Sequence, residues 1–365
     1  MAHNSRFLPA ALLAAAAFVL PAAAQSPPTD LTELDLEEIL SLHIRRAGDS
    51  PGDSRWSVGY RFVWARFDGN RDGTEDVPLE QVIFRPGEET HTADNFPVVP
   101  LEISQQAHLL EIGFAATQRL GLRLLIPFIS QQTDHCSVVP GFESFRISSS
   151  GVGDVILSAS YPVWNVGSHF LLATAALSLP AGSIDETGPT PRDATKDPQL
   201  PYTMQIGSGT FDVTPGFVYS GGTEALRWGG ELRGTLRLGE TDRDYTLGNR
   251  LAVTAWARRA VTDWFEPSVA LVAQRWGRID GEDVSLRVDT PDAPSPFPYP
   301  AAVTDPAKFG GTKVVAQIGA ALCLPGDSSD RYTLELDFGI PAYQSLNGPQ
   351  PKEIWRVGAG WSWKL

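Results

Sequence analysis

Apolar residues alternate with polar or small residues in segments of about ten residues from Arg55 to Leu365, the length typical of strands that cross a bilayer. In the first segment the apolar set is Trp56, Val58, Tyr60, Phe62 and Trp64, and in the last it is Trp355, Val357, Ala359, Trp361, Trp363 and Leu365. Because successive side chains of a strand point to opposite faces, this period predicts strands with one apolar face. The pattern predicts twelve strands, near residues 55–65, 110–114, 120–128, 155–161, 169–180, 211–219, 228–238, 250–260, 264–279, 314–324, 332–340 and 355–365.

The connections between these segments alternate strictly between short and long. The short ones are residues 117–119, 164–168, 221–225, 261–263 and 325–330, and the long ones are 68–104, 131–151, 181–209, 240–249, 280–311 and 342–353. A barrel inserted from the periplasm has short periplasmic turns and long outer loops. The sequence therefore predicts an all-β fold: a transmembrane antiparallel up-and-down β-barrel of about 12 strands, with both ends periplasmic.

The spacing of tryptophans agrees with a membrane location. Trp56 and Trp64 are eight residues apart on one predicted face, as are Trp355 and Trp363. In a tilted strand each pair spans roughly 20 Å, close to the height of the apolar band of an outer-membrane barrel. The alternative is a soluble β-sandwich, which would expose apolar patches larger than soluble monomers tolerate.

Three parts are expected along the chain: a signal peptide over residues 1–24, an N-terminal helical segment over residues 25–54, and the barrel over residues 55–365. The first part carries Arg6, an apolar run and Ala22-Ala23-Ala24, which is typical of an export signal cleaved before Gln25. In the second part, residues 30–46 have an apolar stripe and predict a helix that lies in the periplasm or plugs the barrel.

The charge composition limits the classes of partner that the protein can bind. The chain has 29 basic and 43 acidic residues, a formal net charge of −14, which argues against nucleic acid. The expected location is the outer membrane of a Gram-negative cell. The expected partners are outer-membrane lipid and lipopolysaccharide, the barrel-assembly machinery through the C-terminal strand, and a small-molecule solute.

Charged residues occur on the faces opposite the apolar ones, so they are expected to line the lumen. They are Arg61, Glu111, Arg123, Asp154, Asp212, Glu231, Arg233, Arg237, Lys313, Glu335, Asp337 and Arg356. A barrel of this size has a narrow interior, where buried charges normally pair. The set is therefore either a ladder of ion pairs that fills the lumen or a constriction that selects solutes by charge.

The start of the first long connection resembles a calcium-binding loop. Asp68, Asn70, Asp72, Thr74 and Asp76 stand at ligand positions of such a loop. The position that needs a bidentate acid holds Leu79 instead, and Asp-Gly-Asn is also ordinary turn chemistry. A weak structural calcium site and a plain turn both remain open.

Two long connections are rich in proline, which stiffens loops and cannot extend a sheet. They are residues 181–209 and 280–311, and the second also holds Phe297 and Tyr299. Three interpretations stay open: a lid folded over the barrel mouth, an aromatic docking surface, or merely exposed variable loops.

Several stretches resemble a family of bacterial outer-membrane proteins named for the meta-cleavage pathway of phenol degradation. The matching stretches are residues 68–74, 150–154, 179–185, 200–212 and 339–344. The resemblance implies an outer-membrane transporter and names no solute. Residues 30–40 also resemble the mature start of TonB-dependent receptors, but the chain has no room for their plug domain before the first strand.

The sequence favours passive passage of a small solute, with hydrophobic or aromatic solutes as the candidates. The alternative is a non-transporting structural or adhesive barrel with a closed lumen. No catalytic residues are predicted, because no Gly-x-Ser-x-Gly elbow follows a strand and opens a helix, and the protein is not expected to be an enzyme.

Overall fold

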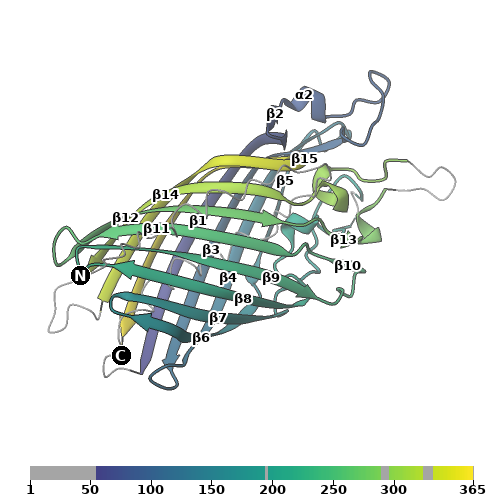
Figure 1. Ribbon diagram of the computed structural model, residues 1–365. Helices are drawn as coiled ribbons and strands as arrows, with labels where there is room; N and C mark the ends of the chain where they lie inside the picture. The colour runs from purple at the N-terminus through teal and green to yellow at the C-terminus, as the bar shows by residue number, and fades with distance from the viewer. Residues whose placement is uncertain (1–54, 194–195, 289–295, 324–331, 365) are drawn as a thin grey trace, which may run out of the picture.

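A computed structural model describes residues 55–193, 196–288, 296–323 and 332–364. Eleven strand elements form one antiparallel sheet that closes through pairing of β15 with β1 (Figure 1). They are β1 (Trp56–Gly73), β3 (Val98–Ala115), β4 (Gly121–Ser137), β6 (Val155–Val166), β7 (His169–Leu179), β8 (Phe211–Gly222), β9 (Leu226–Leu238), β11 (Arg250–Arg259), β12 (Phe265–Trp276), β14 (Gly311–Cys323) and β15 (Tyr332–Lys364). The predicted up-and-down β-barrel is confirmed.

The last element, β15, folds back on itself and supplies two strands of the wall. Its residues 333–346 pair with β14, and its residues 346–364 pair with β1. Gly348 has a φ of 75° between the two arms. Two hydrogen bonds join Gln344 and Glu353 across the arms. The Gln344 side-chain amide donates to the Glu353 carbonyl at 2.9 Å, and the Glu353 backbone N–H donates to the Gln344 side-chain oxygen at 3.0 Å. The barrel wall therefore consists of twelve membrane-crossing strands, as the alternation predicts.

The wall extends further at the long-loop end than the sequence predicts. β1 continues to Gly73 and pairs with β2 (Glu75–Val77), and β5 (Ser144–Val152) extends the hairpin with β4. The predicted loop over residues 342–353 is the tip of the β15 hairpin. The prediction of long irregular loops was wrong in these three places, because apolar alternation stops at the membrane surface while backbone pairing continues into solvent.

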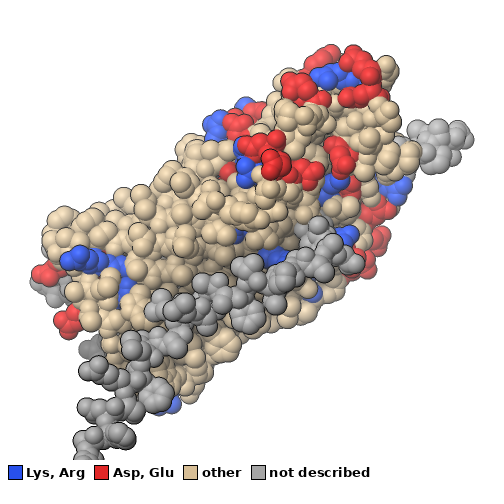
Figure 2. Space-filling model, turned by 45° about the horizontal axis from the view of Figure 1, so that its top comes forward, with Lys and Arg blue, Asp and Glu red and all other residues tan. Residues whose placement is uncertain are grey.

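The alternation places side chains as expected. Within β1, Val63 and Ala65 are buried at 3% and 0% exposure, whereas Trp56 on the other face is 51% exposed. In Figure 2, charged side chains gather mainly at the ends of the visible face, most densely at the long-loop end, and the body between them is mostly uncharged. This is the surface of a membrane-spanning barrel, and the end with the short turns is its periplasmic end.

Three long connections lie at the extracellular end (Figure 1): loop 3 (residues 180–210), loop 4 (residues 239–249) and loop 5 (residues 277–310). Loop 3 contains η2 (Tyr202–Met204), and loop 4 contains β10 (Tyr245–Thr246). Loop 5 contains β13 (Asp280–Gly281), which pairs with β10, then η3 (Val284–Leu286), η4 (Ala302–Thr304) and η5 (Pro306–Lys308). The first long connection carries α2 (Leu79–Val82).

Two expectations concern parts of the chain outside this description. The signal peptide (residues 1–24) and the N-terminal helical segment (residues 25–54) precede the first described residue. Within the described ranges, the helices are too short or too polar to cross a bilayer.

Candidate functional site in the barrel lumen

Most of the charged side chains predicted on the inward face form ion pairs, some within one strand and some between strands. Arg61 on β1 pairs with Asp337 on β15, and Arg237 on β9 pairs with Asp212 on β8. Two further pairs are Arg123–Glu111 at 3.2 Å and Arg233–Glu231 at 3.0 Å. Pairing compensates the cost of removing each charge from water. These inward charges are therefore largely paired.

Lys313 and Arg356 share one partner, Glu353, which the sequence analysis missed. The Glu353 side chain has no exposed surface, and its carboxylate lies 2.7 Å from Lys313 Nζ and 2.6 Å from Arg356 Nε. The sequence placed Glu353 in a loop. A register shift between Glu353 and Trp355 in the pairing with β1 breaks the period of two at that point, so Glu353 and Arg356 reach the same face although they are three residues apart.

Two predicted residues stand apart from these pairs. Asp154 holds the two ends of loop 3, accepting hydrogen bonds from the backbone N–H groups of Gly182 at 2.9 Å and Ser208 at 2.8 Å, and from the Ser208 hydroxyl at 2.6 Å. Glu335 is half-buried near the periplasmic end of β15. Asp154 therefore fixes a loop at the wall.

The inner faces of β1, β3, β4 and β6 carry an apolar patch beside their polar and charged residues. Its buried residues are Val63, Ala65, Phe67, Val98, Ile103, Ala107, Leu109, Leu125, Ile129 and Ile156. Ile206 from loop 3 and Ala301 and Val303 from loop 5 pack into the same cluster. The lumen thus has an apolar patch on strands that also carry Arg61, Glu111 and Arg123, and two loops lie against this patch. The sequence analysis missed the patch, because alternation does not show which strands turn apolar residues inward as well.

Loop 3 is bound to the inner wall by polar contacts around Met204, which is fully buried. Ser149 Oγ donates to the Met204 carbonyl at 2.6 Å, and Thr133 Oγ1 donates to the Met204 sulfur at 3.2 Å. Gln131 Nε2 donates to the Gln205 carbonyl at 3.2 Å. These contacts place loop 3 inside the extracellular half of the barrel, so the interpretation as a lid holds, and the lid is folded inward.

An aromatic cluster joins loops 3, 4 and 5. The ring of Tyr202 makes edge contacts with Tyr245 and Phe309 at centroid distances of 4.9 and 5.4 Å. Edge-to-face aromatic contacts of this kind add to the stabilisation from burial. Burial also raises the pKa of the Tyr202 hydroxyl above its ordinary value, so this group stays neutral and accepts a hydrogen bond from the backbone N–H of Asp283 at 2.8 Å.

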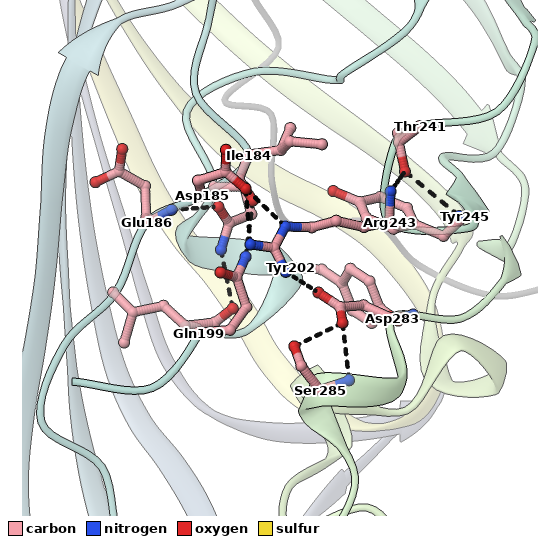
Figure 3. Close-up of polar contacts among 12 residues, drawn as sticks. Ile184, Asp185, Glu186, Gln199, Tyr202, Thr241, Arg243, Tyr245, Asp283 and Ser285 are labelled. Atoms are coloured by element: carbon pink, nitrogen blue, oxygen red, sulfur yellow. Dashed lines mark hydrogen bonds and ion pairs between the residues drawn. The ribbon is translucent and has the colours of Figure 1, made fainter. Parts of the chain in front are cut away.

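Arg243 of loop 4 bridges the other two loops (Figure 3). Its Nε lies 2.8 Å from Asp185 Oδ1 of loop 3, and its Nη1 lies 3.1 Å from Asp283 Oδ2 of loop 5. Asp283 is itself oriented by the backbone N–H and hydroxyl of Ser285, at 2.9 and 2.6 Å. Burial works to lower the pKa of Arg243, but the two carboxylates outweigh it and the net direction is upward. We call Arg243, Asp185 and Asp283 the loop clamp.

The predicted calcium ligands lie on a β-hairpin instead of a calcium-binding loop. In the pairing of β1 with β2, Asn70 faces Val77 and Asp72 faces Glu75. Among the described residues, no group of three or more His, Cys, Asp or Glu side chains is placed to hold a metal. An extended strand spaces alternate residues by roughly 6.6 Å, so Asp68, Asn70, Asp72, Thr74 and Asp76 lie along a hairpin instead of around one ion, as a calcium loop would place them.

Several of these side chains have other partners. Asp76 accepts from Arg71 Nε at 2.8 Å and pairs with Lys352, and Asp72 accepts from the Gly348 backbone N–H at 3.0 Å. We therefore expect the unfolding temperature to be equal in calcium and in chelator. A rise in calcium that disappears in Asp72→Asn would contradict this expectation.

The comparisons with known proteins agree with the geometry. The family described as "Putative MetA-pathway of phenol degradation" matches residues 103–284. No curated protein has a matching sequence. An outer membrane channel from Pseudomonas putida F1 is 15% identical with a TM-score of 0.54, covering 86% of this chain and 99% of that one.

Two more distant structures have TM-scores below 0.5. A Pseudomonas aeruginosa FadL homologue is 10% identical with a TM-score of 0.39, covering 86% of this chain and 90% of its own. The transport unit of the autotransporter AIDA-I from Escherichia coli is 10% identical with a TM-score of 0.43, and the match covers 93% of this chain and 100% of that one. The family resemblance seen in the sequence motifs is confirmed: this chain is an outer-membrane β-barrel related to the phenol-degradation MetA-pathway family.

Proposed function

We propose that this protein is a passive outer-membrane transporter for a small apolar or aromatic solute. The observation that carries the proposal is the apolar patch of the lumen, which residues of loops 3 and 5 cover at the extracellular end. The paired charges around the patch give a free ion little attraction, whereas the patch favours solutes that gain from leaving water. The similar fold of an outer membrane channel from Pseudomonas putida F1 is consistent with this role.

One outer attachment of the loops is weak. Asp185 of the loop clamp is 73% exposed in its side chain, and exposed ion pairs contribute only about 0–1 kcal/mol. Loop 3 meets the wall through the apolar contact of Ile206 and through hydrogen bonds to Ser149, Thr133 and Gln131, which water can replace. We infer that the loops are a displaceable cover.

The same loops favour one alternative, a structural or adhesive barrel with a permanently closed lumen. Tyr202, Met204 and Phe309 are almost completely buried at the loop end, as expected if the cover never leaves. In both cases the role is non-enzymatic, and the two functions differ in whether anything crosses.

Reconstituted protein in planar bilayers and in liposomes separates the two functions. A variant with residues 186–206 replaced by a short Gly-Ser linker keeps every wall strand and removes the inserted part of loop 3. We expect small conductance and measurable uptake of a neutral aromatic such as phenol by the complete chain, and larger values for the variant. If neither protein conducts or takes up solute while both show the heat-dependent gel shift of folded barrels, the closed-barrel function is correct.

A further inference from the structure

A shallow hollow of about 790 Å³ lies on the lipid-facing surface of the wall across β9, β11, β12, β14 and β15. Residues on its floor and rim are exposed and apolar, among them Leu226, Leu271, Ile318, Phe338 and Ile340. The surface of a barrel is normally convex, so a hollow of this size requires small residues in its floor. Ala255, Ala257 and Ala316 provide them.

The strand register shows that the hollow is a groove. One row of outward side chains is Trp228, Ala257, Val269, Ile318 and Phe338, each opposite the next across adjacent strands. A second row is Ala255, Leu271, Ala316 and Ile340. Five strands at about 4.8 Å spacing give a groove roughly 19 Å long, which exceeds the ~15 Å depth of one leaflet's hydrocarbon. Such a groove is long enough to hold an extended acyl chain.

The groove begins at the periplasmic end of the barrel. Leu226 is the first residue of β9, next to a short turn, whereas Phe338 and Ile340 lie near the middle of the first arm of β15. The groove therefore lies within the periplasmic half of the wall. Lipid in that leaflet is phospholipid, whereas lipopolysaccharide occupies the outer leaflet.

A basic side chain stands where the groove meets the membrane surface. Arg259 is exposed, lies opposite Leu226 in the pairing of β11 with β9, and shares the outward face with Ala257. Within the described part of the chain, Arg259 makes no ion pair, in contrast to Arg258, which turns inward to Glu266 at 3.0 Å. A guanidinium at the lipid headgroup level is suited to hydrogen-bond a phosphate.

We propose that this groove is a binding site for one phospholipid of the periplasmic leaflet, with an acyl chain along the two rows and the phosphate at Arg259. A second copy of this chain fits less well, because two concave surfaces related by a two-fold axis enclose a void. The site is separate from the lumen, so it does not depend on the proposed transport.

Native mass spectrometry with added phosphatidylglycerol tests the site, and diacylglycerol of the same acyl composition, which lacks the phosphate, is the control lipid. The complete chain is expected to bind one phosphatidylglycerol above the non-specific background. Arg259→Gln should weaken that binding about fivefold, the effect of one basic residue at a membrane surface, and leave diacylglycerol binding unchanged. The double variant Ala257→Phe/Ala316→Phe fills the groove and should abolish the tight binding of both lipids.

Matched controls are available on the other side of the barrel. Ala175→Phe adds the same bulk to a lipid-facing position of β7, and Arg119→Gln removes a basic residue from another periplasmic turn. Neither should change lipid binding, and the gel shift on heating shows that each variant is folded. Unchanged phosphatidylglycerol binding by the filled variant would overturn the proposal. Tighter binding of lipopolysaccharide than of phosphatidylglycerol would also overturn it. The same holds if the original protein forms a dimer and the filled variant alone does not.

Discussion

Replacing Glu353 by alanine is expected to destabilise the folded barrel by about 3–5 kcal/mol, the usual cost of breaking a buried ion pair from one side. The change leaves Lys313 and Arg356 buried with their shared carboxylate gone. Among the described residues, Lys313 keeps the face of the Trp276 ring, 5.9 Å from its Nζ, and a cation–π contact replaces a small part of the lost interaction. The measurement is the temperature at which the folded band on a denaturing gel converts to the unfolded one.

Glu335 gives a matched control on the same hairpin. It is a half-buried glutamate near the periplasmic end, so Glu335→Ala should change stability by no more than about 0.5 kcal/mol. Equal conversion temperatures for the two variants would show that Glu353 does not compensate the two cations.

Replacing Arg243 by alanine is expected to open the barrel. It removes the side chain of the loop clamp that forms ion pairs with both other loops, through Asp185 and Asp283. If its two ion pairs together contribute about 1.4 kcal/mol, the ratio of open to closed channels rises about tenfold. Single-channel recordings in planar bilayers measure this ratio directly.

Arg287 is the control for this experiment. Its ion pair with Glu282, at 2.9 Å, lies within loop 5, so Arg287→Ala removes a similar charge pair without separating the loops. The clamp has no gating role if Arg243→Ala and Arg287→Ala have the same open ratio as the original protein.

The barrel could be predicted because its signal is local. The period of two in Trp56–Trp64 and in Trp355–Trp363 assigns each residue to a face without knowledge of the partner strand. The alternating connection lengths then give the order and orientation of the strands. Twelve crossings follow from these two patterns, and the structure agrees.

The sequence predicted which charged residues line the lumen, but it did not predict which of them form ion pairs with one another. Pairing depends on register, and the shift between Glu353 and Trp355 moves Glu353 onto the inward face. No pattern in the sequence marks such a bulge, so Glu353 was assigned to a loop. Asp154 lies directly before β6, close to its predicted place, but its partners, Gly182 and Ser208, come from a loop whose path the strand pattern does not determine.

The inward fold of loops 3 and 5 was one of three interpretations of their proline content. The inward fold depends on tertiary contacts. Tyr202 packs in an apolar cluster with residues of other loops, and Met204 accepts a hydrogen bond from Thr133 on a distant strand. The calcium motif shows the opposite case. Its residue spacing matches a calcium loop, but pairing with β2 places the segment in a hairpin.

The most direct test of the account is a reversible lock between loop 3 and the wall. A Cβ added at Gly151 would lie 3.6 Å from the nearest side-chain carbon of Ile206, close enough for a disulfide after small adjustment. The variant is Gly151→Cys/Ile206→Cys in a background where Cys136 and Cys323 are serine, with each single cysteine variant as the control.

The measurement is phenol uptake by liposomes that contain the double cysteine variant, before and after reduction. The account predicts that the oxidised protein takes up no more solute than empty liposomes, and that reduction restores the uptake of the cysteine-free protein. Equal uptake in the oxidised and reduced states would show that solute does not need loop 3 to move, and would contradict the account.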